Sequence, residues 1–72
     1  MKIEGTVTYQ SIEGGFWGIE TKSGKQYRPI NMPEQLKSSG ANVEVVAAEA
    51  DVMSFIMWGT PIRIISFSTL MP

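Results

Sequence analysis

Aromatic residues beside glycines, together with a few cations, are the side chains of this chain with the clearest binding chemistry. Residues 13–19 and 57–61 each place glycine next to phenylalanine or tryptophan. Aromatic rings stack on nucleic-acid bases, at about 1–3 kcal/mol per base, and they also anchor protein partners. Arg28, Lys22 and Lys25 would supply positive charge for phosphates. These residue types indicate binding rather than catalysis.

Catalytic chemistry has few groups available in this chain. There is no cysteine and no histidine, which removes thiolate nucleophiles, the commonest metal ligand and the commonest general base. Glu13 and Asp51 could approach each other if their loops lie at one end of the fold. Without a cleft or a nucleophile beside them, solvated charge is the favoured interpretation. We expect no enzyme, no metal site and no cofactor.

Length and charge set the next limits. A chain of 72 residues predicts one domain over 1–72, too small to enclose a deep pocket. Six basic and seven acidic residues leave a net charge of −1 and form no cluster, which disfavours strong binding to nucleic-acid backbones. No apolar run approaches the roughly 18 residues of a membrane-spanning helix. With no signal-like apolar core at the start, we expect a cytoplasmic protein, either a monomer or a weak homodimer.

Alternating apolar and polar residues predict five strands. They cover residues 2–12, 16–21, 26–29, 43–50 and 62–69. Gly5 interrupts the first strand and predicts a bend or bulge there. Residues 22–25 form a polar hairpin loop in which Gly24 supplies a positive φ.

One short helical segment is predicted between the third and fourth strands, over residues 31–40. Asn31 is the candidate N-terminal cap, Pro33 suits the first turn, and Gly40 suits the position just past the end. The fourth strand has apolar residues on both faces, which indicates a two-sided strand or a mid-strand bulge. In the fifth strand Ile62 and Ile64 share one face, whereas Ile65 and Phe67 share the other.

The order strand, strand, strand, short helix, strand, strand predicts a mostly β protein. It matches the five-stranded Greek-key barrel of the OB-fold. An SH3-like barrel is the nearest competitor, and a helix between the third and fourth strands favours the OB arrangement.

Three segments carry a resemblance that spans nearly the whole chain. They are EGGFWGI at 13–19, YRPINMP at 27–33 and MWG at 57–59. In these segments the chain resembles a family of small, uncharacterised prokaryotic OB-fold-like domains. The resemblance implies the OB-like fold. Because no activity is established for that family, it transfers no catalytic or binding residues.

The candidate binding residues follow from the expected fold. Ligands of OB-folds lie across the second and third strands, bordered by the loops that follow the first and fourth strands. The residues in those places that could contact a ligand are Phe16, Trp17, Tyr27, Arg28, Met53, Phe55, Met57 and Trp58. The competing interpretation is that Trp17, Trp58 and Phe67 fill the barrel core, with residues 51–58 folded down as its cap.

Two functional hypotheses remain open. The favoured one is a non-enzymatic module that binds a protein or peptide, because the charge is near neutral and the segment after the fourth strand is apolar. The β-prone final strand is also suited to pairing with a partner strand or with a second copy. The alternative is weak single-stranded nucleic-acid binding on the face of the second and third strands. Exposure of Phe55 and Met57 favours the first, and a steep salt dependence identifies the second.

Overall fold

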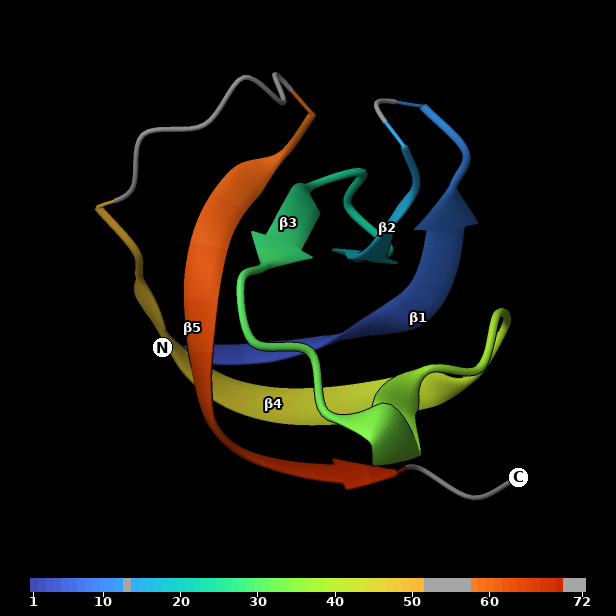
Figure 1. Ribbon diagram of the computed structural model, residues 1–72. Coiled ribbons are helices and arrows are strands. Elements are labelled where there is room, and N and C mark those ends of the chain that lie inside the picture. The colour runs from blue at the N-terminus through green and yellow to red at the C-terminus, as the bar shows by residue number, and fades with distance from the viewer. Residues whose placement is uncertain (13, 52–57, 70–72) are drawn as a thin grey trace.

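A closed five-stranded barrel forms the body of the protein (Figure 1). The structure is a computed structural model that describes residues 1–12, 14–51 and 58–69. The strands are β1 (Lys2–Gln10), β2 (Phe16–Glu20), β3 (Gln26–Pro29), β4 (Asn42–Glu49) and β5 (Thr60–Thr69). Their spatial order is β1-β2-β3-β5-β4, with β3 and β5 parallel and the other pairs antiparallel. The prediction of a mostly β, OB-like barrel is confirmed.

Strand β1 closes the barrel because it pairs with β4 along its first half and with β2 along its second half. Thr6 is the crossover residue, paired with Asn42 on one side and with Glu20 on the other. A Cβ at the preceding residue, Gly5, would lie 2.6 Å from the carbonyl oxygen of Glu20. The predicted bend at this glycine therefore has a steric cause: only a residue without a side chain lets the two backbones approach this closely. Figure 1 shows the resulting curve of β1.

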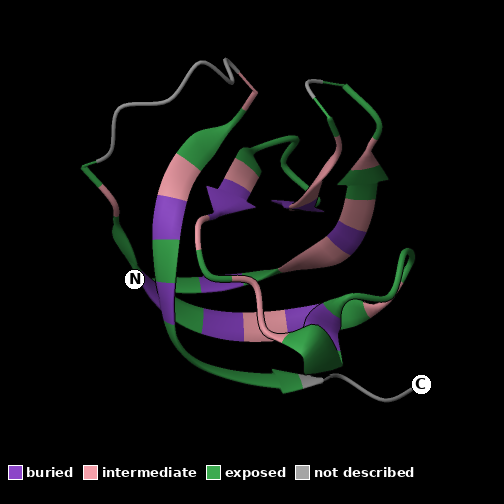
Figure 2. Cartoon of the chain, viewed as in Figure 1, coloured by how far each residue is buried: buried purple, intermediate pink, exposed green. Residues whose placement is uncertain are grey.

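The core is aliphatic. Figure 2 shows buried residues alternating with more exposed ones along β4, as a pleated strand with one face inward requires. The buried cluster consists of Ile3, Val7, Ile19, Leu36, Val43, Val45, Ala47, Ile62 and Ile64. Trp17 and Tyr27 pack against this cluster while keeping some exposure.

Trp58 and Phe67, two of the aromatic residues considered as core fillers, are neither in the buried cluster nor among the residues packed against it. Trp58 is half-buried, and Phe67 is 40% exposed. The interpretation in which both of them fill the core is therefore wrong. Branched aliphatic side chains suffice for a barrel this narrow, because their volume fits between closely spaced strands.

A bulge in β5 explains why its apolar residues change face. Val46 pairs with Ser66 and Ala47 pairs with Ile64, so Ile65 is an extra residue with no partner on β4. Ile64 is buried, whereas Ile65 is 68% exposed. The extra residue shifts the alternation of side chains between the two faces of β5 by one position. Phe67 therefore lies on the same face as its partner Val45.

The helical segment is shorter than the sequence predicts. It is the single 3-10 turn η1 (Glu34–Leu36), whose N-terminal cap position is Pro33 and which has no side-chain cap. The turn closes at Lys37, so Gly40 is not its C-terminal cap; with φ +91° it instead donates its N–H to the carbonyl of Val7. No helix within the described residues is long and apolar enough to cross a membrane.

Asn31 does not cap the helical turn as predicted, and its side chain forms hydrogen bonds with β5 instead. Its Oδ1 accepts the backbone N–H of Ile64 at 2.8 Å, and its Nδ2 donates to the carbonyl of Ile64 at 3.0 Å. One residue earlier, the backbone N–H of Ile30 donates to the carbonyl of Ile62. The primary amide of Asn31 thus continues the ladder on β5 beyond the point where β3 ends, as a backbone amide would.

Candidate binding face on strands β2 and β3

The pleat of β2 divides its residues between the barrel interior and the outer face. Ile19 is fully buried in the core, and Trp17 packs against the same cluster. Phe16, Gly18 and Glu20 alternate with them and therefore lie on the outer face. The outer face of β2 and β3 is the place where OB-folds receive ligands.

Trp58 lies over this outer face and rests on Gly18. A Cβ at Gly18 would overlap the six-membered ring of the Trp58 indole. The same indole packs against Phe16, with ring centroids 5.5 Å apart and planes tilted by 59°. Gly59, at φ +71°, supports this placement because a Cβ there would lie 3.1 Å from the carbonyl oxygen of Gln26. In the structure, the glycines of the glycine–aromatic pattern thus allow the Trp58 ring to pack on the outer face of β2.

Arg28 lies on the same face of the neighbouring strand. Tyr27 is paired with Ile19 and packs against the core, so Arg28 points to the other side of β3. One step along the same antiparallel register, Arg28 stands opposite Gly18. β3 lies between β2, which carries Gly18, and β5, which Trp58 precedes. Arg28 is only 8% exposed.

The buried guanidinium of Arg28 is incompletely hydrogen-bonded. Its Nε is buried and has no hydrogen-bond partner within the part of the chain that the structure describes. No ion pair joins Arg28 to any carboxylate of the described residues. Buried donors are nearly always paired in proteins, and an unpaired one points to a functional role.

The structure separates the remaining candidate residues. Trp17 makes an edge-to-face contact with Tyr9 at 5.1 Å between centroids, and Tyr27 packs on the core; both are on the inner side of the sheet. The other three candidates, Met53, Phe55 and Met57, lie outside the described residues. Whether Phe55 and Met57 are exposed or folded down as a cap therefore stays untested.

Glu13 also lies outside the described residues, so its expected approach to Asp51 stays untested. Asp51 itself is exposed. No three of the acidic side chains within the described ranges gather into a group that could hold a metal ion. The described residues thus offer the candidate face no carboxylate cluster to support catalysis.

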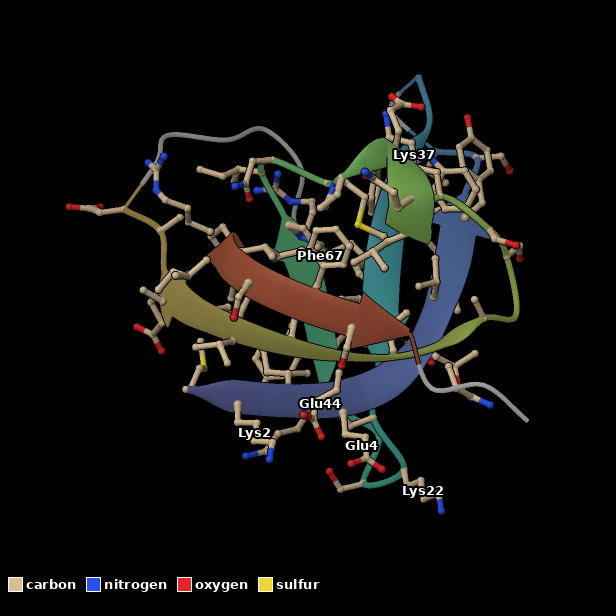
Figure 3. All side chains as sticks on the ribbon, turned by 90° about the horizontal axis from the view of Figure 1, so that it is seen from below. Lys2, Glu4, Lys22, Lys37, Glu44 and Phe67 are labelled. Atoms are coloured by element: carbon tan, nitrogen blue, oxygen red, sulfur yellow. The ribbon has the colours of Figure 1, made fainter. Side chains whose placement is uncertain are left out.

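Charges of both signs lie together on another side of the barrel. Figure 3 shows Lys2, Glu44, Glu4 and Lys22 along one side, from β1, β4 and the loop after β2, with the two carboxylates between the two cations. The Nζ of Lys2 lies 3.6 Å from a carboxylate oxygen of Glu44. Cations separated by carboxylates in this way do not form the basic stripe that tracks a nucleic-acid backbone.

Sequence reasoning did not single out two features of the surface. The first is Gly18, on which the Trp58 ring packs. In the sequence it resembles any glycine in a strand, and only its contact with Trp58 identifies its role. Val46 and Ile65 are 40% and 68% exposed on the outer side of β4 and β5. The apolar residues on both faces of these strands were the signal for that exposure.

Comparisons of the chain with models of protein families, with curated proteins and with solved structures find no match. The barrel is therefore described from its own strand order and pairing. The candidate site rests on Phe16, Arg28 and Trp58, which the structure places on one face.

Proposed function

We propose that this domain is a non-enzymatic binding module that recognises a peptide segment of a partner protein on the outer face of β2 and β3. The observation that carries the proposal is the presence of the Phe16–Trp58 ring pair and of the buried Arg28 on one face. Tryptophan and arginine are the residue types that most often dominate the energy of protein interfaces.

The aromatic pair would supply the apolar part of the contact. Both rings are half-buried, so each keeps ring surface accessible to a partner. Trp58 is held from below by Gly18 and from the side by Phe16. A ring held in place loses little conformational freedom on binding, which favours affinity.

Single-stranded nucleic acid is the alternative ligand of the same face. Trp17 and Tyr27, two of the rings expected to stack on bases, lie on the inner side of the sheet. Lys22 stands beside the carboxylates of another side of the barrel (Figure 3). With two stacking rings turned inward and no basic stripe among the described residues, the geometry supports a peptide better than a nucleic acid.

A displayed library of random peptides tests the proposal. The wild-type chain is used for selection, and enriched peptides are then measured against Phe16→Ala and against Ile65→Ala. Ile65 is the matched control because it is an exposed apolar residue on a different strand. We expect Phe16→Ala to weaken binding about tenfold, since it removes one ring of the site. Ile65→Ala should leave the affinity unchanged.

The opposite pattern would overturn the site. Peptides that lose affinity with Ile65→Ala and keep it with Phe16→Ala would place the binding surface on β4 and β5. Failure of any peptide to enrich above a selection on the Phe16→Ala/Trp58→Ala double variant would reject peptide recognition by this face. Amide spectra of each variant show whether the barrel remains folded.

A further inference from the structure

We infer that Arg28 is the anchor for a carboxylate of the bound ligand, so that the peptides recognised by this face carry an acidic group beside an apolar side chain. That the ligand is a peptide rests on the proposed function. The group that this peptide must present is a carboxylate, and the atom that binds it is Nε of Arg28.

The burial and the incomplete hydrogen bonding of Arg28 support this assignment. Arg28 is 8% exposed, and its Nε is buried without a hydrogen-bond partner among the described residues. Arg63, the other arginine of the chain, is exposed on β5, where water can bind its donors. A buried donor without a partner is unfavourable, and an incoming anion that accepts its hydrogen removes this penalty.

The shape of the guanidinium selects a carboxylate. Nε–H and the neighbouring Nη–H lie in one plane and form a fork whose spacing matches the two oxygens of a carboxylate. Because Nε has no partner in residues 1–12, 14–51 and 58–69, these residues leave the side-on fork incompletely used. Lysine has no equivalent geometry.

The charge of the face favours a single carboxylate over a phosphate or a phosphate chain. Glu20 lies on the same outer face of β2 as Gly18, the residue opposite Arg28. The single positive charge of Arg28 balances one carboxylate, whereas a phosphate group carries close to two negative charges, and the carboxylate of Glu20 on the same face further disfavours the larger charge. The chain as a whole has a net charge of −1.

The Trp58 ring determines what accompanies the carboxylate. The ring rests on Gly18, which stands opposite Arg28 in the β2–β3 register, so the indole belongs to the same face as Arg28. A ligand that binds Nε from this face shares that face with the indole. An aromatic or large aliphatic group next to the carboxylate fits this neighbour, because it can pack on the indole while the oxygens meet the fork.

Nitrogen-15 NMR of the side-chain Nε–H of Arg28 reads the predicted contact directly in the wild-type protein. The probes are N-acetylphenylalanine, with a terminal carboxylate, and N-acetyl-glutamyl-phenylalaninamide, with a side-chain carboxylate. N-acetylphenylalaninamide is the matched probe without a carboxylate, and phenyl phosphate is the phosphate probe. Arg28→Lys assigns the resonance by removing it, and Arg63→Lys is the matched control.

We expect at least one carboxylate probe to shift the Nε–H resonance of Arg28 together with the indole N–H of Trp58. It should bind about tenfold more tightly than the amide probe, and Arg28→Lys should abolish this preference, whereas Arg63→Lys should preserve it. The two carboxylate probes distinguish a peptide terminus from an acidic side chain.

Three results would overturn the inference. The first is an Nε–H resonance that no carboxylate probe moves, and the second is equal affinity for N-acetylphenylalanine and its amide. The third is tighter binding of phenyl phosphate, which would assign Arg28 to a phosphate. If the probes shift Trp58 without moving Arg28, the aromatic face still binds ligands, and only the role of Arg28 fails. The peptide selection tests the proposed function separately.

Discussion

At the scale of single residues, the candidate site depends on Gly18, because only a residue without a side chain leaves room for the Trp58 ring. Gly18 is buried because the indole of Trp58 lies directly on it. Its φ is not in the left-handed region, so the need for glycine here is steric rather than conformational. Because glycine has no Cβ, the large ring packs directly on the strand, and a Cβ at this position would interfere with it.

Gly18→Ala is expected to displace the Trp58 ring. The added methyl group overlaps the indole, and overpacking of this kind costs about 1–3 kcal/mol of unfolding free energy. Urea unfolding measures the loss, and the indole N–H resonance of Trp58 reports the displacement. In a Trp58→Ala background the same substitution should cost little, because the overlapping ring is gone. An equal loss in both backgrounds would show that the cost arises from the strand and not from the ring.

At the scale of the elements, Asn31 substitutes for a strand. Strand β3 ends at Pro29, whose ring nitrogen carries no hydrogen to donate, and β5 continues to Thr69. The side-chain amide of Asn31 satisfies both backbone groups of Ile64 at this point. The segment between β3 and η1 is thereby fastened to β5, and with it the turn that carries the buried Leu36.

Asn31→Ala should lower the unfolding free energy by about 1–3 kcal/mol, since two backbone groups of Ile64 lose their partners. The midpoint of urea unfolding measures this change. Asn42→Ala is the matched control: Asn42 is exposed, and its side chain accepts only a 3.1 Å hydrogen bond from the Thr6 hydroxyl within the described residues. That control should change stability by less than about 0.5 kcal/mol. Equal effects of the two substitutions would contradict the strand-like role of Asn31.

At the scale of the whole molecule, the distribution of charge bears on the class of partner. The net charge is −1, and Lys2 and Lys22 share one side of the barrel with Glu4 and Glu44 (Figure 3). Binding to a polyanion draws its energy from several cations acting together. The arrangement therefore predicts weak binding, or none, to single-stranded nucleic acid.

A titration with a mixed-sequence single-stranded oligonucleotide at low salt checks this expectation. The amide spectrum of the wild-type chain should not change. The Glu4→Lys/Glu44→Lys double variant, which removes the interleaved carboxylates, should acquire binding that weakens as salt is added. Shifts in the wild-type protein that cluster at Lys25 and Arg28 and disappear at higher salt would instead favour the nucleic-acid hypothesis.

The sequence predicted the strands well because strand formation here follows local alternation. All five predicted segments overlap a strand, and Gly24 has the positive φ expected of its hairpin loop. Apolar residues on both faces of the fourth strand indicated a two-sided strand or a mid-strand bulge; the register does shift at the middle of β4, and the extra residue is Ile65 of the neighbouring β5. The roles of Asn31 and Gly40 were predicted wrongly, because cap signals describe neighbours in sequence, whereas the partners of these residues are Ile64 and Val7, far away along the chain.

By itself, the sequence determined the β-rich class, the number of strands and the residue types available for binding. The tertiary structure decided which of those residues act together. Trp17 and Trp58 have similar glycine-rich surroundings in the sequence, yet Trp17 packs on the core and Trp58 lies on the outer face. The physical reason is that the outcome depends on pairings distant in sequence: the turn at Gly59 and the contact with Gly18 place the indole on the face that also carries Arg28, and no local pattern encodes that arrangement.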